Sequence, residues 1–311
     1  MHRKSLLRQT TVTALFVVVA LALGQGSRAD GISLVSFSYE LVPKAELDIY
    51  NDRGEELAVE AQTFTSKLAL PILIDGKRTI VLNFLTFRWM RQSYDNANAD
   101  RNFFRPDLLY TLKYGFVFRQ VLSDRWSVAM LVQPALLTDG VNTGINQLLL
   151  RAGFLFEKKV NPRFKYAIGM GYSDDYGSEK VLPVVQLGYK PNDRWNIKLD
   201  LPQKITAMYK MSERVKAGLQ AKVTGGHFRI GEDFRLTDGS TTANGRVKYS
   251  IVNVGPAIDL SLYKGVAATI NTGLSVYRRF QLYDADGDML READFERSWF
   301  LKVRLAYNVG G

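Results

Sequence analysis

Few residues of this sequence have the chemistry of a catalytic or metal site. The chain contains no cysteine and only two histidines, His2 and His227. Thiolate chemistry, disulfides and multi-histidine metal sites are therefore excluded. A Ser-His-Asp arrangement would depend on His227, which the alternation counted from Val223 places on the apolar row of a strand. We therefore predict no catalytic residues and expect that the protein is not an enzyme.

The acidic run of residues 284–288 has the composition of a calcium loop but not its spacing. An EF-hand loop that began at Asp284 would need glycine at the sixth position and glutamate at the twelfth. Those positions hold Met289 and Phe295. We predict no metal site and no cofactor. No phosphate-binding glycine loop and no aromatic-basic platform is present, so nucleic acid is not an expected partner.

The clearest chemical signal is a set of cations that alternate with apolar residues. Lys302 and Arg304 lie between Leu301, Val303 and Leu305. A lysine or arginine that faced lipid at the bilayer midplane would cost about 2–4 kcal/mol, so such cations must face inward if the strand crosses a membrane. The predicted lumen-lining residues are Lys113, Arg119, Arg151, Lys165, Lys198, Lys216, Lys222, Lys302 and Arg304. The carboxylates expected to face them are Glu60, Asp200 and Asp259.

The elements that carry these residues are long strands with a period of two. The expected strands are 32–40, 56–72, 78–91, 107–120, 126–137, 145–156, 163–172, 180–190, 195–201, 204–210, 215–229, 245–262, 266–281 and 297–308. Many are long enough to cross a bilayer at a tilt. The sequence therefore predicts an all-β fold, a single transmembrane antiparallel up-and-down β-barrel. The best count is 14 strands, and it falls to 12 if the short pair 195–201 and 204–210 does not span.

The N-terminus has the pattern of a secretory signal peptide. Basic residues precede an apolar run over 12–23, and Ser27-Arg28-Ala29 supplies small residues at a cleavage site. We expect residues 1–29 to be removed and residues 30–311 to form the barrel. The whole chain has a net charge of +10, and a hydrophobic fraction of 46% excludes wholesale disorder.

Short and long connections alternate along the chain, as in outer-membrane barrels with short periplasmic turns and longer extracellular loops. Several short turns share one pattern, in which a turn residue and an arginine precede an aromatic residue or valine. Three of these aromatic residues, Trp126, Phe164 and Trp195, are predicted to form part of a periplasmic aromatic girdle.

The run from Val181 to Tyr189, followed by residues 191–202, resembles a family of outer-membrane β-barrel proteins of unknown function from Gram-negative bacteria. Those proteins carry a similar Leu-Pro…Tyr-x-Pro-Asn-x-x-Trp…Leu-Pro run. The resemblance implies a single barrel and a location in the outer membrane, but no activity and no binding residues. The sequence departs from the usual pattern at its end, because Tyr307 lies four residues before the C-terminus whereas such barrels usually end in an aromatic residue.

Three functions are compatible with these features. The first is an outer-membrane passive pore or small-solute transporter with a basic lumen. The second is a closed barrel with a structural or surface-recognition role, and the third is a secreted soluble β-sandwich that binds a ligand. The expected partners are outer-membrane lipid, the barrel insertion machinery and small anionic solutes. For the first function, replacing Lys302 and Arg304 together by Gln is expected to reduce anion preference and leave the fold intact.

Overall fold

The computed structural model describes residues 32–50, 56–74, 78–95, 106–141, 144, 148–173, 180–231, 234–235, 241–242 and 245–309. The predicted signal peptide, residues 1–29, lies outside the described residues. The long strands are β1 (Ile32–Tyr50), β2 (Glu56–Ile74), β3 (Thr79–Asp95), β4 (Leu108–Val121), β5 (Trp126–Thr138), β6 (Leu148–Asn161), β7 (Phe164–Ser173), β8 (Lys180–Tyr189), β9 (Trp195–Leu201), β10 (Lys204–Lys210), β11 (Val215–Arg229), β14 (Arg246–Tyr263), β15 (Val266–Tyr283) and β17 (Ser298–Val309).

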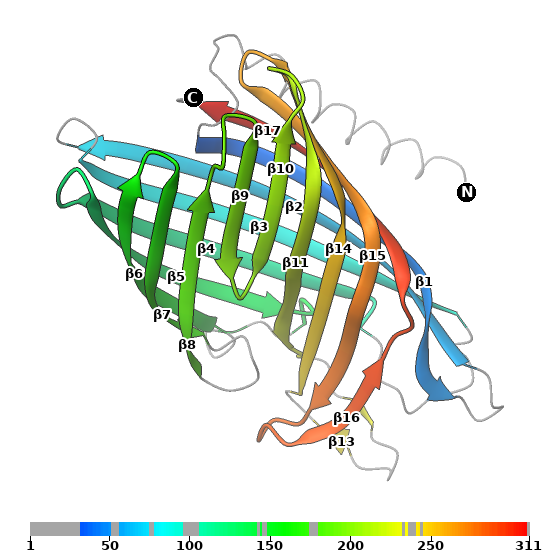
Figure 1. The fold of residues 1–311 in the computed structure, drawn as a ribbon. Helices are drawn as coiled ribbons and strands as arrows, with labels where there is room; N and C mark the ends of the chain where they lie inside the picture. Colours follow the sequence, from blue (N-terminus) through cyan, green and yellow to red (C-terminus); the bar gives the residue numbers. More distant parts are fainter. Residues whose placement is uncertain are drawn as a thin grey trace, which may run out of the picture.

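Within the described ranges these 14 strands close into one antiparallel barrel, as predicted (Figure 1). Each strand pairs with its sequence neighbours in the barrel order, and β1 closes the cylinder against β17. In the described part of the chain, β12 (Phe234–Arg235) and β13 (Thr241–Thr242) form a separate two-stranded sheet, and the short strand β16 (Met289–Asp294) extends the barrel sheet. The last of these pairs with the end of β15, inside a segment that was expected to be a loop.

The connections give the barrel two unlike ends. Tight turns at 122–125, 211–214 and 264–265 lie at one end, called here the tight-turn end. The longer connections, including the one that carries β16, lie at the other, called the loop end. β1 and β2 each have 19 residues. β1 therefore continues to Tyr50, into the range 41–55 that was expected to be a loop, because its antiparallel pairing with β2 extends that far.

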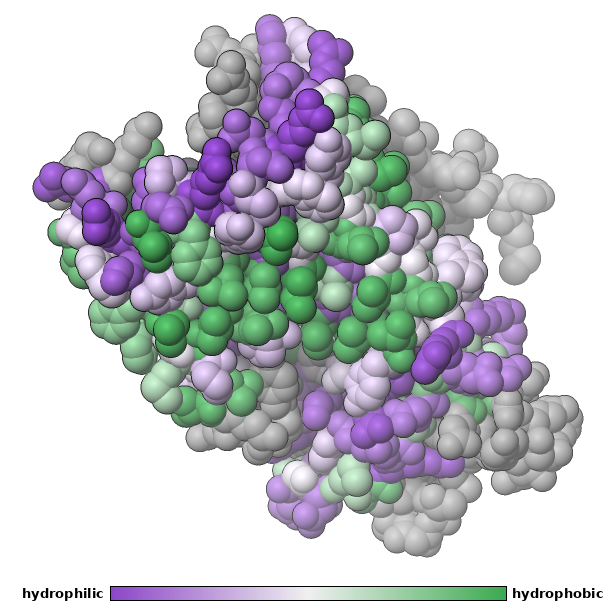
Figure 2. Space-filling model, in the orientation of Figure 1, coloured by the Kyte–Doolittle hydropathy of each residue, from purple (hydrophilic) through white to green (hydrophobic). Residues whose placement is uncertain are grey.

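The outer face of the cylinder is an apolar belt. Met130, Ile168 and Leu219 are 53%, 55% and 64% exposed, and they represent a much larger set of exposed large hydrophobic side chains. On the face seen in Figure 2, hydrophobic side chains form a green band between two purple, hydrophilic zones. An apolar surface of this extent is stable in lipid rather than in water, and a closed sheet satisfies its own backbone hydrogen bonds there. The soluble β-sandwich alternative is therefore wrong. Among the described residues, no helix is long and apolar enough to cross a membrane.

The loop half of the barrel interior is filled by an apolar core. Leu57, Leu109, Leu137, Phe228 and Phe300 are among its most deeply buried side chains. They come from strands on opposite sides of the cylinder, which is flattened here. A parallel bridge between Arg229 of β11 and Thr138 of β5 joins two strands that lie far apart in the barrel order.

The hairpin of β9 and β10 is short and leaves a break in the wall. Each strand has seven residues, and their turn at Pro202-Gln203 lies well short of the loop end (Figure 1). Beyond this turn, residues 180–184 of β8 and residues 224–229 of β11 pair with neither β9 nor β10 in the described part of the chain. We call the break between these two segments the wall notch.

Two of the long strands approach each other unusually closely at Gly255. A Cβ atom added there would lie 1.8 Å from the carbonyl oxygen of Thr272 on β15, and a backbone atom cannot move aside as a flexible side chain can. We expect Gly255→Ala to lower the folded fraction of the refolded barrel several-fold, measured as the heat-dependent shift on a gel. Gly171→Ala is the matched control, because its nearest neighbour is a side-chain methyl of Val184 at 3.2 Å. Equal folding of the two variants would contradict the close approach.

Candidate functional site

The register of the strands determines which side chains face the lumen. Residues directly opposite each other on neighbouring strands share a face, and the pairs Glu40–Lys302 and Ser38–Arg304 belong to the inner face. All nine predicted lumen residues lie on this inner face: Lys113, Arg119, Arg151, Lys165, Lys198, Lys216, Lys222, Lys302 and Arg304. They do not form one continuous row, because the structure separates them into several groups.

One group surrounds a cavity of about 410 Å³ in the middle of the lumen, called here the basic chamber. Among the described residues, its lining contains one carboxylate, Glu40, and six cationic side chains, Lys67, Arg88, Lys113, Lys222, Lys302 and Arg304. The chamber is closed towards the loop end by apolar residues that include Met90 and Ile251, which also belong to the apolar core. A cavity with this excess of positive charge attracts anions, and its low-dielectric walls strengthen the effect.

Glu40 lies at the centre of a polar network that joins four strands. Its carboxylate accepts a hydrogen bond from the ammonium of Lys302 on β17. It also accepts one from Nδ2 of Asn253 on β14 at 2.8 Å, and Ser275 on β15 donates to Oδ1 of Asn253 at 2.6 Å. All four residues are buried or nearly so. One chamber cation is thus held by a structural partner.

Arg88 connects the chamber to the opposite wall. Its guanidinium donates to the carbonyl oxygen of Gly225 on β11 at 3.3 Å and to the hydroxyl of Thr111 at 3.4 Å. The same guanidinium lies 5.8 Å from the ring centre of Phe228, a residue of the apolar core. Arg88 therefore lies at the boundary between the charged chamber and the apolar core.

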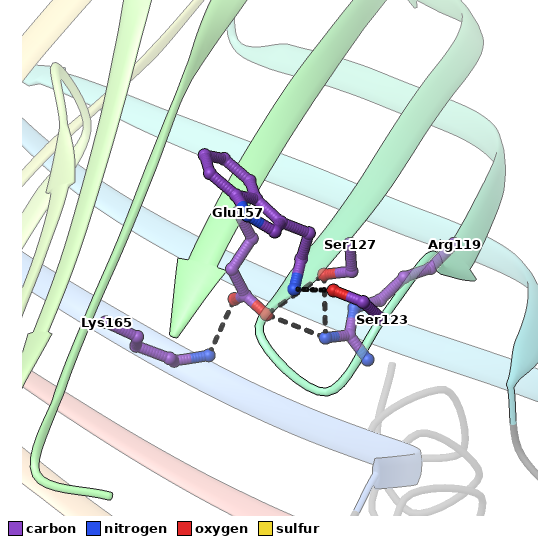
Figure 3. A network of polar contacts seen from close by, with 6 residues as sticks. Arg119, Ser123, Ser127, Glu157 and Lys165 are labelled. Carbon is purple, nitrogen blue, oxygen red and sulfur yellow. Dashed lines mark hydrogen bonds and ion pairs between the residues drawn. The ribbon is translucent and has the colours of Figure 1, made fainter. Parts of the chain in front are cut away.

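A second group of predicted lumen residues lies near the tight-turn end. Figure 3 shows Arg119, Ser127 and Lys165 converging on the carboxylate of Glu157. Arg119 donates at 2.7 Å, Lys165 at 2.8 Å and Ser127 at 3.2 Å. Two cations therefore share one carboxylate here. Their charge is partly neutralised and contributes less to anion attraction than the charge of the basic chamber.

The remaining predicted lumen cations lie apart from these two groups. Arg151 lines two cavities next to the basic chamber. Lys216 lines a cavity of about 550 Å³ among the tight turns, and Lys198 lies on the inner face of β9.

Several residues that face the lumen were not predicted from the sequence. Lys67 lies on the inner row that alternation from Thr63 would have found, and Lys204 on the one that alternation from Thr206 would have found. Arg88 lies on the inner row of β3, opposite Thr65 and Thr111. Glu40, between Tyr39 and Leu41, was also missed, and so was Glu157, which follows the apolar run 154–156. Glu60 was predicted to face inward, but it lies on the outer row, between the buried Val59 and Ala61. Its carboxylate accepts a hydrogen bond from the side-chain amide of Gln62.

The repeated turn pattern has a clear structural cause. Asn161 Oδ1 accepts hydrogen bonds from the backbone N–H groups of Arg163 and Phe164, both at 2.8 Å. Asn192 makes the same pair of bonds to Arg194 and Trp195, at 2.9 and 3.0 Å. Ser123 and Ser212 repeat the arrangement at two other turns. Side chains of this kind cap tight turns, which explains why the aromatic residue, or Val215 at the Ser212 turn, stands three positions later.

The three aromatic residues of the predicted girdle follow these turns. Trp126, Phe164 and Trp195 are the first residues of β5, β7 and β9, at the tight-turn end and on the outer face. Trp195 contacts Tyr209 edge-on, and Lys158 lies over the ring of Trp126. Rings and cations placed together at one edge of an apolar belt are the arrangement expected at a membrane interface.

The other sequence features that suggested chemistry lie outside the basic chamber. His227 is 1% exposed and contacts the ring of Tyr283. Asp284 closes its own turn by accepting backbone hydrogen bonds from Gly287 and Asp288. Within the described ranges, no group of three or more acidic or histidine side chains could hold a metal ion.

Further ion pairs and charged hydrogen bonds lie near the two ends of the barrel. Arg279 donates to Asp294 and Glu292 at the loop end, and the hydrogen bond from Asp294 raises the pKa of Arg279 above its ordinary value. At the tight-turn end a hydrogen bond to Tyr209 raises the pKa of Arg194. Exposed pairs of this kind contribute little to stability.

Comparison with known proteins identifies a family but no activity. The family model of a domain of unknown function, DUF6268, matches residues 24–308. No curated protein matches the sequence. Among solved structures, an outer-membrane channel from Pseudomonas putida F1 is similar at a TM-score of 0.46 and 8% identity, over 91% of this chain and 97% of that one. A Pseudomonas aeruginosa FadL homologue gives a TM-score of 0.44 and 11% identity, over 90% and 91% of the two chains. The toluene transporter TodX of P. putida gives 0.39 and 10%, over 91% of each chain.

Proposed function

The chain belongs to the DUF6268 family, a domain of unknown function, and we propose that it is an outer-membrane barrel whose basic lumen takes up small anionic solutes, as a passive pore or a transporter. The observation that carries this proposal is the charge of the basic chamber, where six cationic side chains face one carboxylate. Even with the pair between Lys302 and Glu40 counted, cations outnumber carboxylates among the described residues of this lining.

The location follows from the two faces of the wall. The apolar belt of Figure 2 fits a bilayer, and the N-terminal signal pattern directs the chain out of the cytoplasm. In this orientation the tight-turn end faces the periplasm and the loop end faces the exterior. Trp126, Phe164 and Trp195 then form part of the periplasmic girdle.

The second candidate is a closed barrel with a structural or surface-recognition role. The apolar core favours it, because Leu137, Phe228 and Phe300 are fully buried across the loop half of the lumen. A solute that entered from the periplasmic side would reach the basic chamber but would meet this core beyond it. A transporter with this structure must therefore move part of the core, whereas a closed barrel keeps it in place.

The experiment that separates these functions is conductance in planar bilayers with a salt gradient. We expect a reversal potential that shows anion preference, weaker at 1 M salt where the screening length falls to about 3 Å. Lys113→Gln with Lys222→Gln removes two of the chamber cations and should reduce the preference several-fold. The matched control is Lys158→Gln, which removes a lysine from the outer face. Cation preference of the unaltered protein would contradict the basic lumen, and a silent bilayer would favour the closed barrel.

A further inference from the structure

A second lumen cavity differs from the basic chamber in the chemistry of its walls. It has a volume of about 470 Å³ and lies against the inner faces of β4 to β8. Its inward-facing lining is mainly apolar or small, and we call it the apolar pocket, with Val117, Ala129, Leu131, Gly153, Leu155 and Val184 as its defining residues. Simple alternation predicts polar inner faces, so this apolar lining in a barrel interior requires an explanation.

The apolar pocket is connected to the basic chamber. A third cavity of about 430 Å³ lies between them. It shares Arg88, Lys113 and Tyr249 with the basic chamber. It shares Arg151, Leu182 and Pro202 with the apolar pocket. The three cavities therefore form one path from an apolar wall to a cluster of cations.

The wall notch borders this path. Leu182 on β8 and Pro202 at the turn line the apolar pocket, and Val223 on β11 lines the connecting cavity. Outside the notch the surface is apolar, since Val181 and Val223 are both well exposed. The apolar pocket thus lies at the break in the wall, level with the apolar belt, and not among the charged turns at the end of the barrel.

We propose that this path is a binding site for a single-chain amphiphile with an anionic head group. The alkyl chain occupies the apolar pocket, and the head group lies between Arg88, Lys113 and Arg151. This inference rests on the proposed function and deepens it, because it names the class of anion. A small inorganic anion would use the cations but leave the apolar lining in contact with water, whereas an alkyl chain removes that surface from water.

The inference is tested by binding of a series of alkyl carboxylates to the refolded full-length barrel in nanodiscs, with empty nanodiscs as the background. Acetate, hexanoate, octanoate and decanoate share one head group. We expect the dissociation constant to fall about threefold to fourfold for each methylene group added, until the pocket is full. Decyltrimethylammonium, with the same chain length and the opposite charge, should bind at least tenfold more weakly than decanoate.

Two variants separate the chain from the head group. Ala129→Phe fills the apolar pocket and should weaken decanoate binding at least tenfold without changing acetate binding. Val128→Phe, on the outer face of the same strand, is the matched control. Lys113→Gln should weaken binding of both carboxylates by a similar factor. If Ala129→Phe does not fold, Val117→Phe places the same ring in the same pocket.

Each outcome decides one question. Equal affinity for acetate and decanoate would overturn the amphiphile site and leave the anion-binding lumen standing. Absence of binding for every carboxylate would overturn both. Equal binding of decanoate and decyltrimethylammonium would overturn the anionic head group, because the cations would then make no contribution. Loss of decanoate binding in Val128→Phe as well as in Ala129→Phe would place the chain outside the lumen and overturn the site.

Discussion

Lys302→Gln is expected to destabilise the folded barrel by about 3–5 kcal/mol, because it leaves the carboxylate of Glu40 buried without its cation. Glu40 would keep its hydrogen bond from Asn253, but an amide cannot replace an ammonium as the partner of a buried charge. The measurement is urea unfolding of the barrel in lipid vesicles, followed by tryptophan fluorescence. The structure therefore changes the sequence-based expectation that Lys302 and Arg304 can both be replaced without affecting the fold.

A double variant identifies the cause. Glu40→Gln combined with Lys302→Gln removes both charges of this pair and should recover most of the lost stability, because the carboxylate is no longer buried without the ammonium that it binds. Arg304→Gln is the matched control on the same strand and the same face. Its guanidinium donates to the hydroxyl of Ser33 at 3.2 Å, so the loss should be about 1 kcal/mol. A double variant that is as unstable as Lys302→Gln would show that the pair does not act as a unit.

The barrel was predictable from the sequence because the sequence signals that specify it are local. Alternation along single strands places Lys302 and Arg304 on one face, and the turn pattern marks the strand starts at Trp126 and Trp195. Both signals depend on residues within a few positions of each other. The 14-strand count followed from these signals, including the short hairpin of β9 and β10.

The interior was less predictable, because it depends on contacts between distant strands. The bridge from Arg229 to Thr138 joins residues that no local pattern relates. A bulge between the pairs Val252–Tyr277 and Asn253–Ser275 shifts the alternation on β15 and places Arg278 and Phe280 inside. The basic chamber could be outlined from single-strand alternation. The apolar core that closes it and the notch beside it could not, because both require knowledge of where β5 and β11 meet.

The meeting of β5 and β11 makes Phe228 the residue on which closure of the lumen depends. Its ring is 0% exposed within the apolar core. Gly226 allows the close approach, since a Cβ atom there would lie 2.8 Å from a methyl group of Leu137. Beyond the bridge, the backbone N–H of Gly231 donates to both carboxylate oxygens of Asp139 at 3.1 Å. The bridge and this backbone-to-carboxylate hydrogen bonding hold the two strands together, and the ring of Phe228 fills the space inside them.

Phe228→Ala is therefore expected to destabilise the barrel by about 3–5 kcal/mol, and to raise its conductance several-fold at the same time. The loss of stability follows from the cavity left in a packed core. The gain in conductance follows from the thinner apolar barrier between the basic chamber and the loop end. Leu219→Ala, an outward substitution on the same strand, is the control and should change neither quantity by much. Stability is measured by urea unfolding and conductance by single-channel recording, both on the same protein preparation. If stability falls while conductance stays unchanged, the core is structural and does not gate the lumen, which favours the closed barrel over the transporter.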